Sequence, residues 1–114
     1  MTNEEIIASN VQIALYVGYK VDNTFPDKNR VYRLGNKIDM DSDFRYHESW
    51  DAIVPVVVKI LLELDKLYWH TNVDEYTIQR EVIKGAWCSV QIKRIWNEVV
   101  KGIQLINKLK DGNK

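Results

Sequence analysis

The pattern of apolar and polar positions predicts a first helix close to the N-terminus. Apolar residues recur there three and four positions apart, which is the spacing of one helix face: Ile7, Val11, Ala14 and Leu15. We expect this amphipathic helix to run from about Glu4 to Tyr16, with Asn3 as its N-cap and Gly18 at its end. Glu4 and Glu5 in the first turn suit the positive end of the helix dipole.

Short strands are predicted in two parts of the chain. The segments "YKVD" (19–22) and "RVYRLGNKI" (30–38) have strand character, with a turn near Gly35-Asn36, and "NTFPDKNR" (23–30) has the composition of a loop. The segment "LYWHTNVDEYTIQREV" (67–82) carries aromatic and β-branched residues around a polar break. It predicts a hairpin with strands over 67–71 and 76–82, followed by a turn at Lys84-Gly85.

Two more helices are predicted beyond residue 49. The second runs from about Trp50 to Leu67 and is apolar over most of its circumference, so we expect it to be buried on more than one side. A strand over the same residues is disfavoured by Pro55. The third helix ends near Leu109; Ser89 is a credible N-cap, and a strand beginning at "AWCSVQI" (86–92) is the open alternative.

These elements predict an α+β fold in which three helices pack on a small, mainly antiparallel β-sheet, within a single domain of residues 1–114. Sixteen basic and sixteen acidic residues cancel, so composition gives no strong signal for nucleic acid or for an anionic membrane. One cysteine, Cys88, excludes an internal disulfide and a multi-cysteine zinc site.

The sequence offers little that would hold a cofactor or a metal. The five glycines are isolated, so no phosphate loop is present, and the two histidines do not form a metal motif. The first residues lack a signal-peptide pattern, and the longest apolar run, Ala52–Val58, is too short to span a bilayer. We therefore expect no cofactor, no metal and a cytoplasmic location.

The densest chemistry lies in "YHESWD" (46–51), directly before the apolar second helix. The favoured interpretation is structural: Ser49 caps the helix, Asp51 complements the dipole and Trp50 folds back over the core. The enzymatic alternative makes His47 a general base. Its weakness is the lack of a nucleophile at a spacing from which a catalytic triad could be inferred.

A binding alternative rests on aromatic residues that adjoin cations. An aromatic face can stack on a base while a neighbouring arginine or lysine neutralises a phosphate. Ordinary core and strand aromatics remain the more frequent origin of such pairs. The candidate ligand-binding residues are Arg33, Arg45, Tyr32, Tyr46, His47 and Trp69.

Two segments of the chain resemble small uncharacterised proteins of bacteriophages and mobile elements from Bacteroidetes-type bacteria. "YHESWDAIVPVVVKI" (46–60) resembles a segment of the form YHTSWDWLMPVVEKI, and "QIKRIWNEVVKGIQLIN" (91–107) resembles KIESVYEAVVEFIKWYN. The opening "NEEIIASNVQIALYVGYKV" (3–21) is also similar to that group, whose style is that of phage α-β-α sandwich domains. Val58 stands where the group has glutamate, which favours an apolar contact between copies.

The resemblance implies a phage or mobile-element origin and does not imply a particular chemistry. We therefore expect a non-catalytic accessory binding protein. Its sharpest version sequesters a small anionic ligand, such as a nucleotide immune signal of the host, and so acts against host defence. The alternatives are a protein-interaction or structural module that uses an apolar helix surface and, less favoured, an enzyme with His47 as base. Whatever the activity, the wide apolar arc of the second helix predicts a homo-oligomer, most simply a symmetric dimer.

Overall fold

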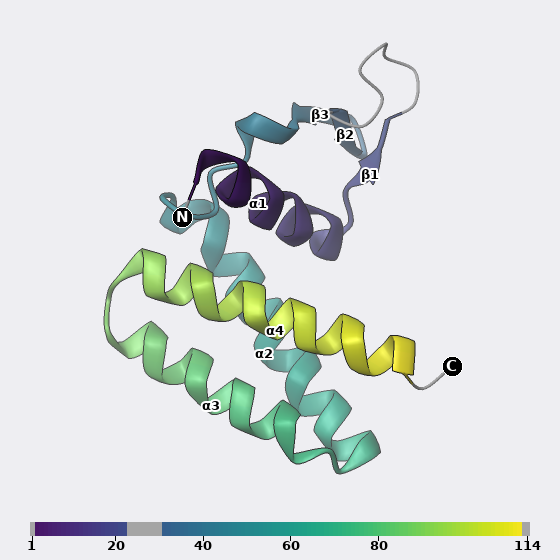
Figure 1. Ribbon diagram of the computed structural model, residues 1–114, viewed down its shortest axis with the longest axis vertical. Helices are drawn as coiled ribbons and strands as arrows, with labels where there is room; N and C mark the ends of the chain where they lie inside the picture. The colour runs from purple at the N-terminus through teal and green to yellow at the C-terminus, as the bar shows by residue number, and fades with distance from the viewer. Residues whose placement is uncertain (1, 23–30, 113–114) are drawn as a thin grey trace. The chain divides into compact units, whose positions relative to one another are not determined.

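The computed structural model describes residues 2–22 and 31–112, and the chain divides into two compact units, Met1–Tyr46 and His47–Lys114 (Figure 1). The first unit contains helix α1 (Asn3–Val17), three short strands and the 3₁₀ turn η1 (Asp41–Asp43). The second contains helices α2 (Trp50–Thr71), α3 (Asp74–Cys88) and α4 (Ile92–Gly112). The predicted α+β class is confirmed, but the described residues form four α-helices and not three.

Helix α1 lies where the apolar spacing predicted it, with one difference at its start. The N-cap is Thr2, whose hydroxyl oxygen accepts a hydrogen bond from the Glu5 amide at 3.2 Å, and Asn3 is the first helical residue. At the other end, Gly18 adopts a left-handed conformation with φ of 119°. This conformation lets the next amide, that of Tyr19, donate to the Ala14 carbonyl at 3.0 Å, which closes the helix as predicted.

The sheet has three strands, β1 (Lys20–Val21), β2 (Val31–Leu34) and β3 (Lys37–Met40), in that order and all antiparallel. Strands β2 and β3 form a hairpin about the predicted turn at Gly35-Asn36. Leu34 pairs with Lys37 across a two-residue turn, and Gly35 at the turn has φ of 59°, a conformation that glycine adopts without strain. The loop predicted over 23–30 lies outside the described residues.

Aromatic packing forms the core of the first unit. The Phe44 ring lies 5.1 Å from Tyr19, 5.9 Å from Tyr32 and 5.8 Å from Tyr46, measured between ring centroids. All four side chains are buried. The Phe44 carbonyl accepts a hydrogen bond at 3.1 Å from the side-chain amide of Asn10, a fully buried residue of α1. The buried amide nitrogen of Asn10 therefore has a hydrogen-bond partner within this core.

Helix α2 begins as predicted and ends later. Ser49 is its N-cap, with its hydroxyl oxygen accepting from the Ala52 amide at 3.3 Å, and Pro55 lies inside the first turns. The helix continues past Leu67 to Thr71, where Asn72 ends it in a left-handed conformation with φ of 56°. Its buried face consists of Ile53, Val56, Val57, Ile60 and Leu64.

The hairpin predicted over 67–82 is wrong. Residues 67–71 complete α2, and the polar break is a helix-to-helix turn in which Asn72 closes one helix while Asp74 and Glu75 occupy the first turn of the next. Tyr76 and Ile83, seven residues apart, are buried on one face of α3. Helical packing of this face outweighs the strand preference of the β-branched and aromatic residues.

The segment between 84 and 92 also differs from the prediction. Lys84-Gly85 is no turn, because both residues lie within α3. Ser89 is the C-cap of α3 and not the N-cap of α4, and its hydroxyl donates to the Ala86 carbonyl at 2.6 Å. Val90 then turns the chain with φ of 58°, which is costly for a β-branched residue.

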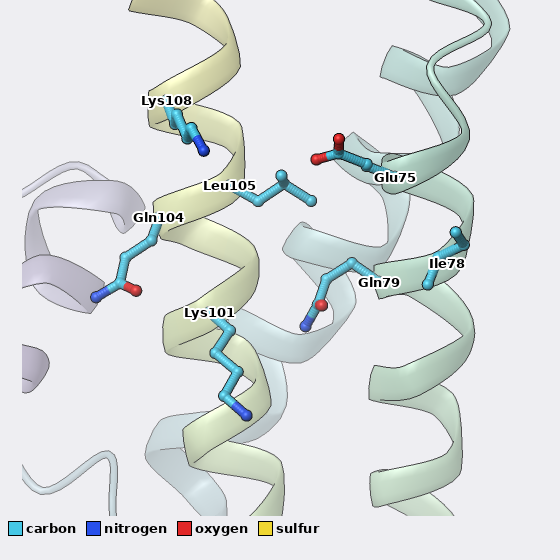
Figure 2. Close-up of a pocket in the computed structure, with 7 residues that line it drawn as sticks. All are labelled: Glu75, Ile78, Gln79, Lys101, Gln104, Leu105 and Lys108. Carbon is cyan, nitrogen blue, oxygen red and sulfur yellow. The ribbon is translucent and has the colours of Figure 1, made fainter.

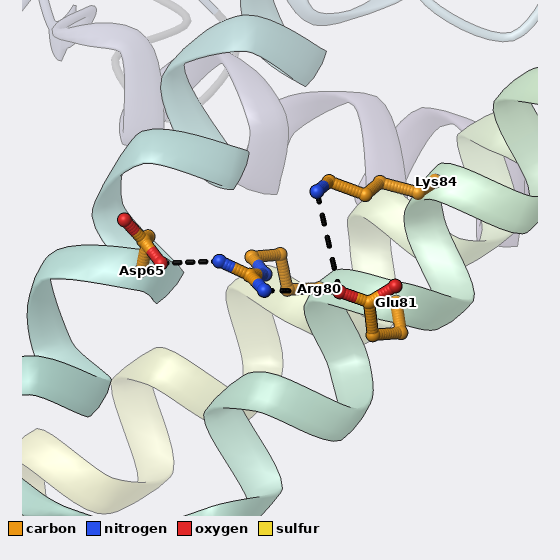
Figure 3. A network of polar contacts seen from close by, with 4 residues as sticks. All are labelled: Asp65, Arg80, Glu81 and Lys84. Atoms are coloured by element: carbon orange, nitrogen blue, oxygen red, sulfur yellow. Dashed lines mark hydrogen bonds and ion pairs between the residues drawn. The ribbon is translucent and has the colours of Figure 1, made fainter.

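Close packing holds the three helices of the second unit together. Gly102 of α4 lies so near its neighbours that an added Cβ would meet Ile60 Cδ1 at 2.7 Å and Ile83 Cδ1 at 3.3 Å. Polar contacts join α2 to α3 at the surface: Arg80 pairs with Asp65 of α2 and, at 3.0 Å, with Glu81 (Figure 3). The three helices therefore form one bundle with its own core.

Candidate functional site

The predicted ligand-binding tyrosines are core residues. Tyr32 and Tyr46 both contact Phe44 and are buried, so neither ring presents a face on which a base could stack. Burial raises the pKa of Tyr46 to about 12, with smaller contributions from Tyr19 and Asp39. Burial likewise raises the pKa of Tyr32, assisted by the charge of Asp41. The hydroxyls are thus held in the neutral form.

The two predicted arginines differ in their surroundings. Arg33 Nε donates to Asp22 Oδ2 at 2.9 Å, and the Asp22 side chain is almost fully buried. The pair lines a shallow hollow of about 480 Å³ beside β1 and β2, together with Gly18, Lys20, Val21 and Gly35. Arg45 is exposed in the segment that follows η1, and it does not belong to this lining.

His47 has the surroundings of a packed side chain. Its ring lies 5.9 Å from that of Trp96, and its Nε2 is 3.8 Å from Glu48 Oε2. Its side chain is only 16% exposed. Trp50, expected to fold over the core, stays partly exposed and meets Trp87 of α3 edge-on at 5.9 Å. The structural interpretation of "YHESWD" therefore agrees with the cap at Ser49 and the ring contact of His47.

Trp69 belongs to a group of exposed apolar residues on α2. Val58, Leu62 and Trp69 are 53%, 67% and 73% exposed. Their spacing of four and seven residues places them on one side of the helix, opposite the buried face that includes Ile60 and Leu64. We call these three residues the α2 outer face.

Sequence reasoning missed a second exposed apolar group because it assigned strands to that region. Ile78 and Val82 of α3 are exposed and lie four residues apart, so they share one face of the helix. Ile78 lines a hollow of about 350 Å³ between α3 and α4. The signal that could have found it is the helical spacing of Tyr76, Ile83 and Ala86, which fixes the buried face and leaves Ile78 outside.

A metal site and a membrane-spanning helix were both sought among the described residues. Within 2–22 and 31–112 there is no group of three or more His, Cys, Asp or Glu side chains that could hold a metal ion. None of the helices described is long and apolar enough to cross a membrane. Comparison of the chain with known protein families, with curated proteins and with solved structures finds no match.

Proposed function

We propose that this protein is a non-catalytic, phage-type accessory binding protein that acts through protein contacts, and that its α2 outer face joins two copies into a symmetric dimer. One observation carries the proposal: Val58, Leu62 and Trp69 expose more than half of their surfaces along one side of a single helix. Exposed apolar groups that line up in this way are typical of interaction surfaces. Tryptophan is also enriched among the residues that dominate binding energy.

The expected strength follows from the size of the face. Two copies that cover each other bury six large apolar side chains, each already partly covered, for a gross gain on the order of 10 kcal/mol. Association costs at least about 4 kcal/mol in lost freedom, so the net gain is about 6 kcal/mol at most. We therefore expect a dissociation constant in the tens of micromolar. In this proposal the protein works in the cytoplasm of the bacterial host, in keeping with the resemblance to phage proteins.

Sedimentation velocity of two variants, each with one exposed apolar residue replaced by glutamate, tests whether the α2 outer face forms the dimer. Val58→Glu places a carboxylate in the α2 outer face and should abolish the dimer, while the melting temperature measured at a concentration where the wild type is monomeric should stay unchanged. Ile78→Glu is the control, because Ile78 is 60% exposed but lies on α3. A dimer that survives Val58→Glu, or that is lost equally with Ile78→Glu, would show that another surface mediates association.

Sequestration of a small anionic ligand remains a second candidate, favoured by the hollow beside β1 and β2. Lys20 and Arg33 bring two cations to this hollow, against the single carboxylate of Asp22. Arg33 is already oriented by its hydrogen bond to Asp22, and an arginine held in place is a good partner for a phosphate. Because the rings of Tyr32 and Tyr46 are buried, the proposed contact is with phosphate and not with a base.

Calorimetry with mononucleotides, cyclic dinucleotides and inorganic phosphate tests this candidate. We expect binding that weakens on Arg33→Ala and on Lys20→Ala and stays unchanged on Arg45→Ala, since Arg45 does not line the hollow. Binding that is unchanged by the first two substitutions would show that this hollow is not the binding site. If no ligand of the panel binds, the protein-contact proposal is the one that remains.

A further inference from the structure

The hollow between α3 and α4 has an apolar floor and a polar rim. Figure 2 shows Leu105 pointing from α4 toward α3, between Glu75 and Gln79, with Lys101 before it and Lys108 after it along α4. Ile78 adds a second apolar side chain, and Val82 continues this apolar line one turn further along α3. The hollow is therefore part of a short groove with an apolar floor, which runs between the two antiparallel helices.

A hydrogen-bonded network keeps the two walls of this groove at a fixed separation. The Gln79 side-chain amide of α3 donates to the Glu98 carbonyl at 3.0 Å and to its carboxylate at 3.4 Å. The same carboxylate pairs with Lys101 at 3.2 Å. Since both helices take part, the groove is preformed, and a ligand need not spend binding energy on opening it.

Most of the charged residues along α4 are cations. Arg94, Lys101 and Lys108 are exposed and follow one another at intervals of seven residues, so they form one cationic stripe beside the groove. Over residues 92–108 of α4 there are four cations, with Lys93 as the fourth, against the single acid Glu98. The whole chain has no net charge, so this stripe is a local feature.

From these observations we propose that the α3–α4 groove binds an acidic amphipathic helix of a partner protein. The partner's apolar side chains contact Ile78, Val82 and Leu105, and its carboxylates face the cationic stripe. A helix that lies in the groove between two others completes a four-helix arrangement, which is a common mode of peptide recognition. Nucleic acid fits less well, because its backbone would leave the apolar floor uncovered.

The probe is a labelled synthetic helix of about fourteen residues, with leucine at helical spacing and glutamate elsewhere, read by fluorescence anisotropy on the full chain. We expect saturable binding that weakens as salt is raised. Replacing both cations with Lys101→Gln and Lys108→Gln should weaken it about tenfold or more. Lys59→Gln with Lys66→Gln removes two charges from α2 and should leave binding unchanged.

Further variants and probes distinguish binding in the groove from binding elsewhere on the chain. Ile78→Ser should also weaken binding about tenfold, and Val58→Glu should not affect it, so this result is independent of the proposed dimer. A probe with lysine in place of glutamate should not bind. The proposal is overturned if the acidic helix shows no saturable binding, if the double lysine variant binds it as well as wild type, or if a single-stranded oligonucleotide displaces it from the groove.

Discussion

Two glycines in neighbouring helices allow one substitution to be made in opposite surroundings. A Cβ at Gly85 of α3 would meet nothing within 4 Å, whereas a Cβ at Gly102 of α4 would lie 2.7 Å from Ile60 Cδ1, and Ile60 is fully buried. Both alanine variants gain about 1 kcal/mol of helix propensity. Only Gly102→Ala overpacks the core, at a cost of about 1–3 kcal/mol. We expect Gly85→Ala to stabilise the chain and Gly102→Ala to destabilise it by about 1 kcal/mol.

The cause can be isolated with Ile60→Val, which removes the Cδ1 atom that the new methyl group would meet. Alone it should cost about 0.5–1.5 kcal/mol. Combined with Gly102→Ala, the added methyl group fills the vacated space, so the double variant should be more stable than the sum of the singles by about 1 kcal/mol or more. Urea unfolding followed by circular dichroism at one protein concentration measures the wild type and the four variants. A Gly102→Ala chain as stabilised as Gly85→Ala would refute this packing of α4.

Three further predictions concern single elements. Ser49→Ala should lower the free energy of unfolding by about 1 kcal/mol through the lost cap of α2, measured by thermal unfolding; an unchanged melting temperature would contradict the cap. Val90→Asn should raise the free energy of unfolding by about 1 kcal/mol, because asparagine tolerates the left-handed conformation and Val90 is 76% exposed; destabilisation in urea would argue against the strain. Burial, aided by Asp39, raises the pKa of Tyr19 to about 12, and burial raises that of Tyr46 to about 12. The stability that these neutral hydroxyls contribute is present below the unfolded pKa of about 10 and is lost as pH rises toward 12. A titration followed by tyrosine absorbance should show that Tyr19 and Tyr46 ionise well above pH 10. Ionisation of both residues near pH 10 would contradict their burial.

The elements that the sequence predicted well are those whose signals are local. The end of α1 at Gly18 and the start of α2 at Ser49 each depend on a few neighbouring residues, and each lies where it was predicted. The turn at Gly35-Asn36 is of the same kind. By contrast, the segment 67–82 has a local preference for strands, and only its packing in the three-helix bundle makes it helical.

The candidate site could be predicted only in part. The apolar circumference of α2 was visible in the sequence, but which residues stay exposed depends on where α3 and α4 pack, so Leu62 could not be separated from Leu64 in advance. Tyr32 and Tyr46 lie beside cations in a strand and a loop, and residues that stack on a base occupy the same kind of position. Only their contacts with Phe44 show that these two tyrosines belong to the core. The groove beside Leu105 was missed because its α3 wall was assigned to a strand.

The central claim is that the α2 outer face joins two copies of the chain, and sedimentation equilibrium of the wild-type protein tests it most directly. Val58, Leu62 and Trp69 are each more than half exposed, and three side chains from each copy are few enough to give only modest affinity. We predict a mass that rises from that of one chain, 13.4 kDa, toward twice that value as the concentration increases from about 1 to about 100 micromolar. A mass of one chain over the whole of this range would contradict the claim.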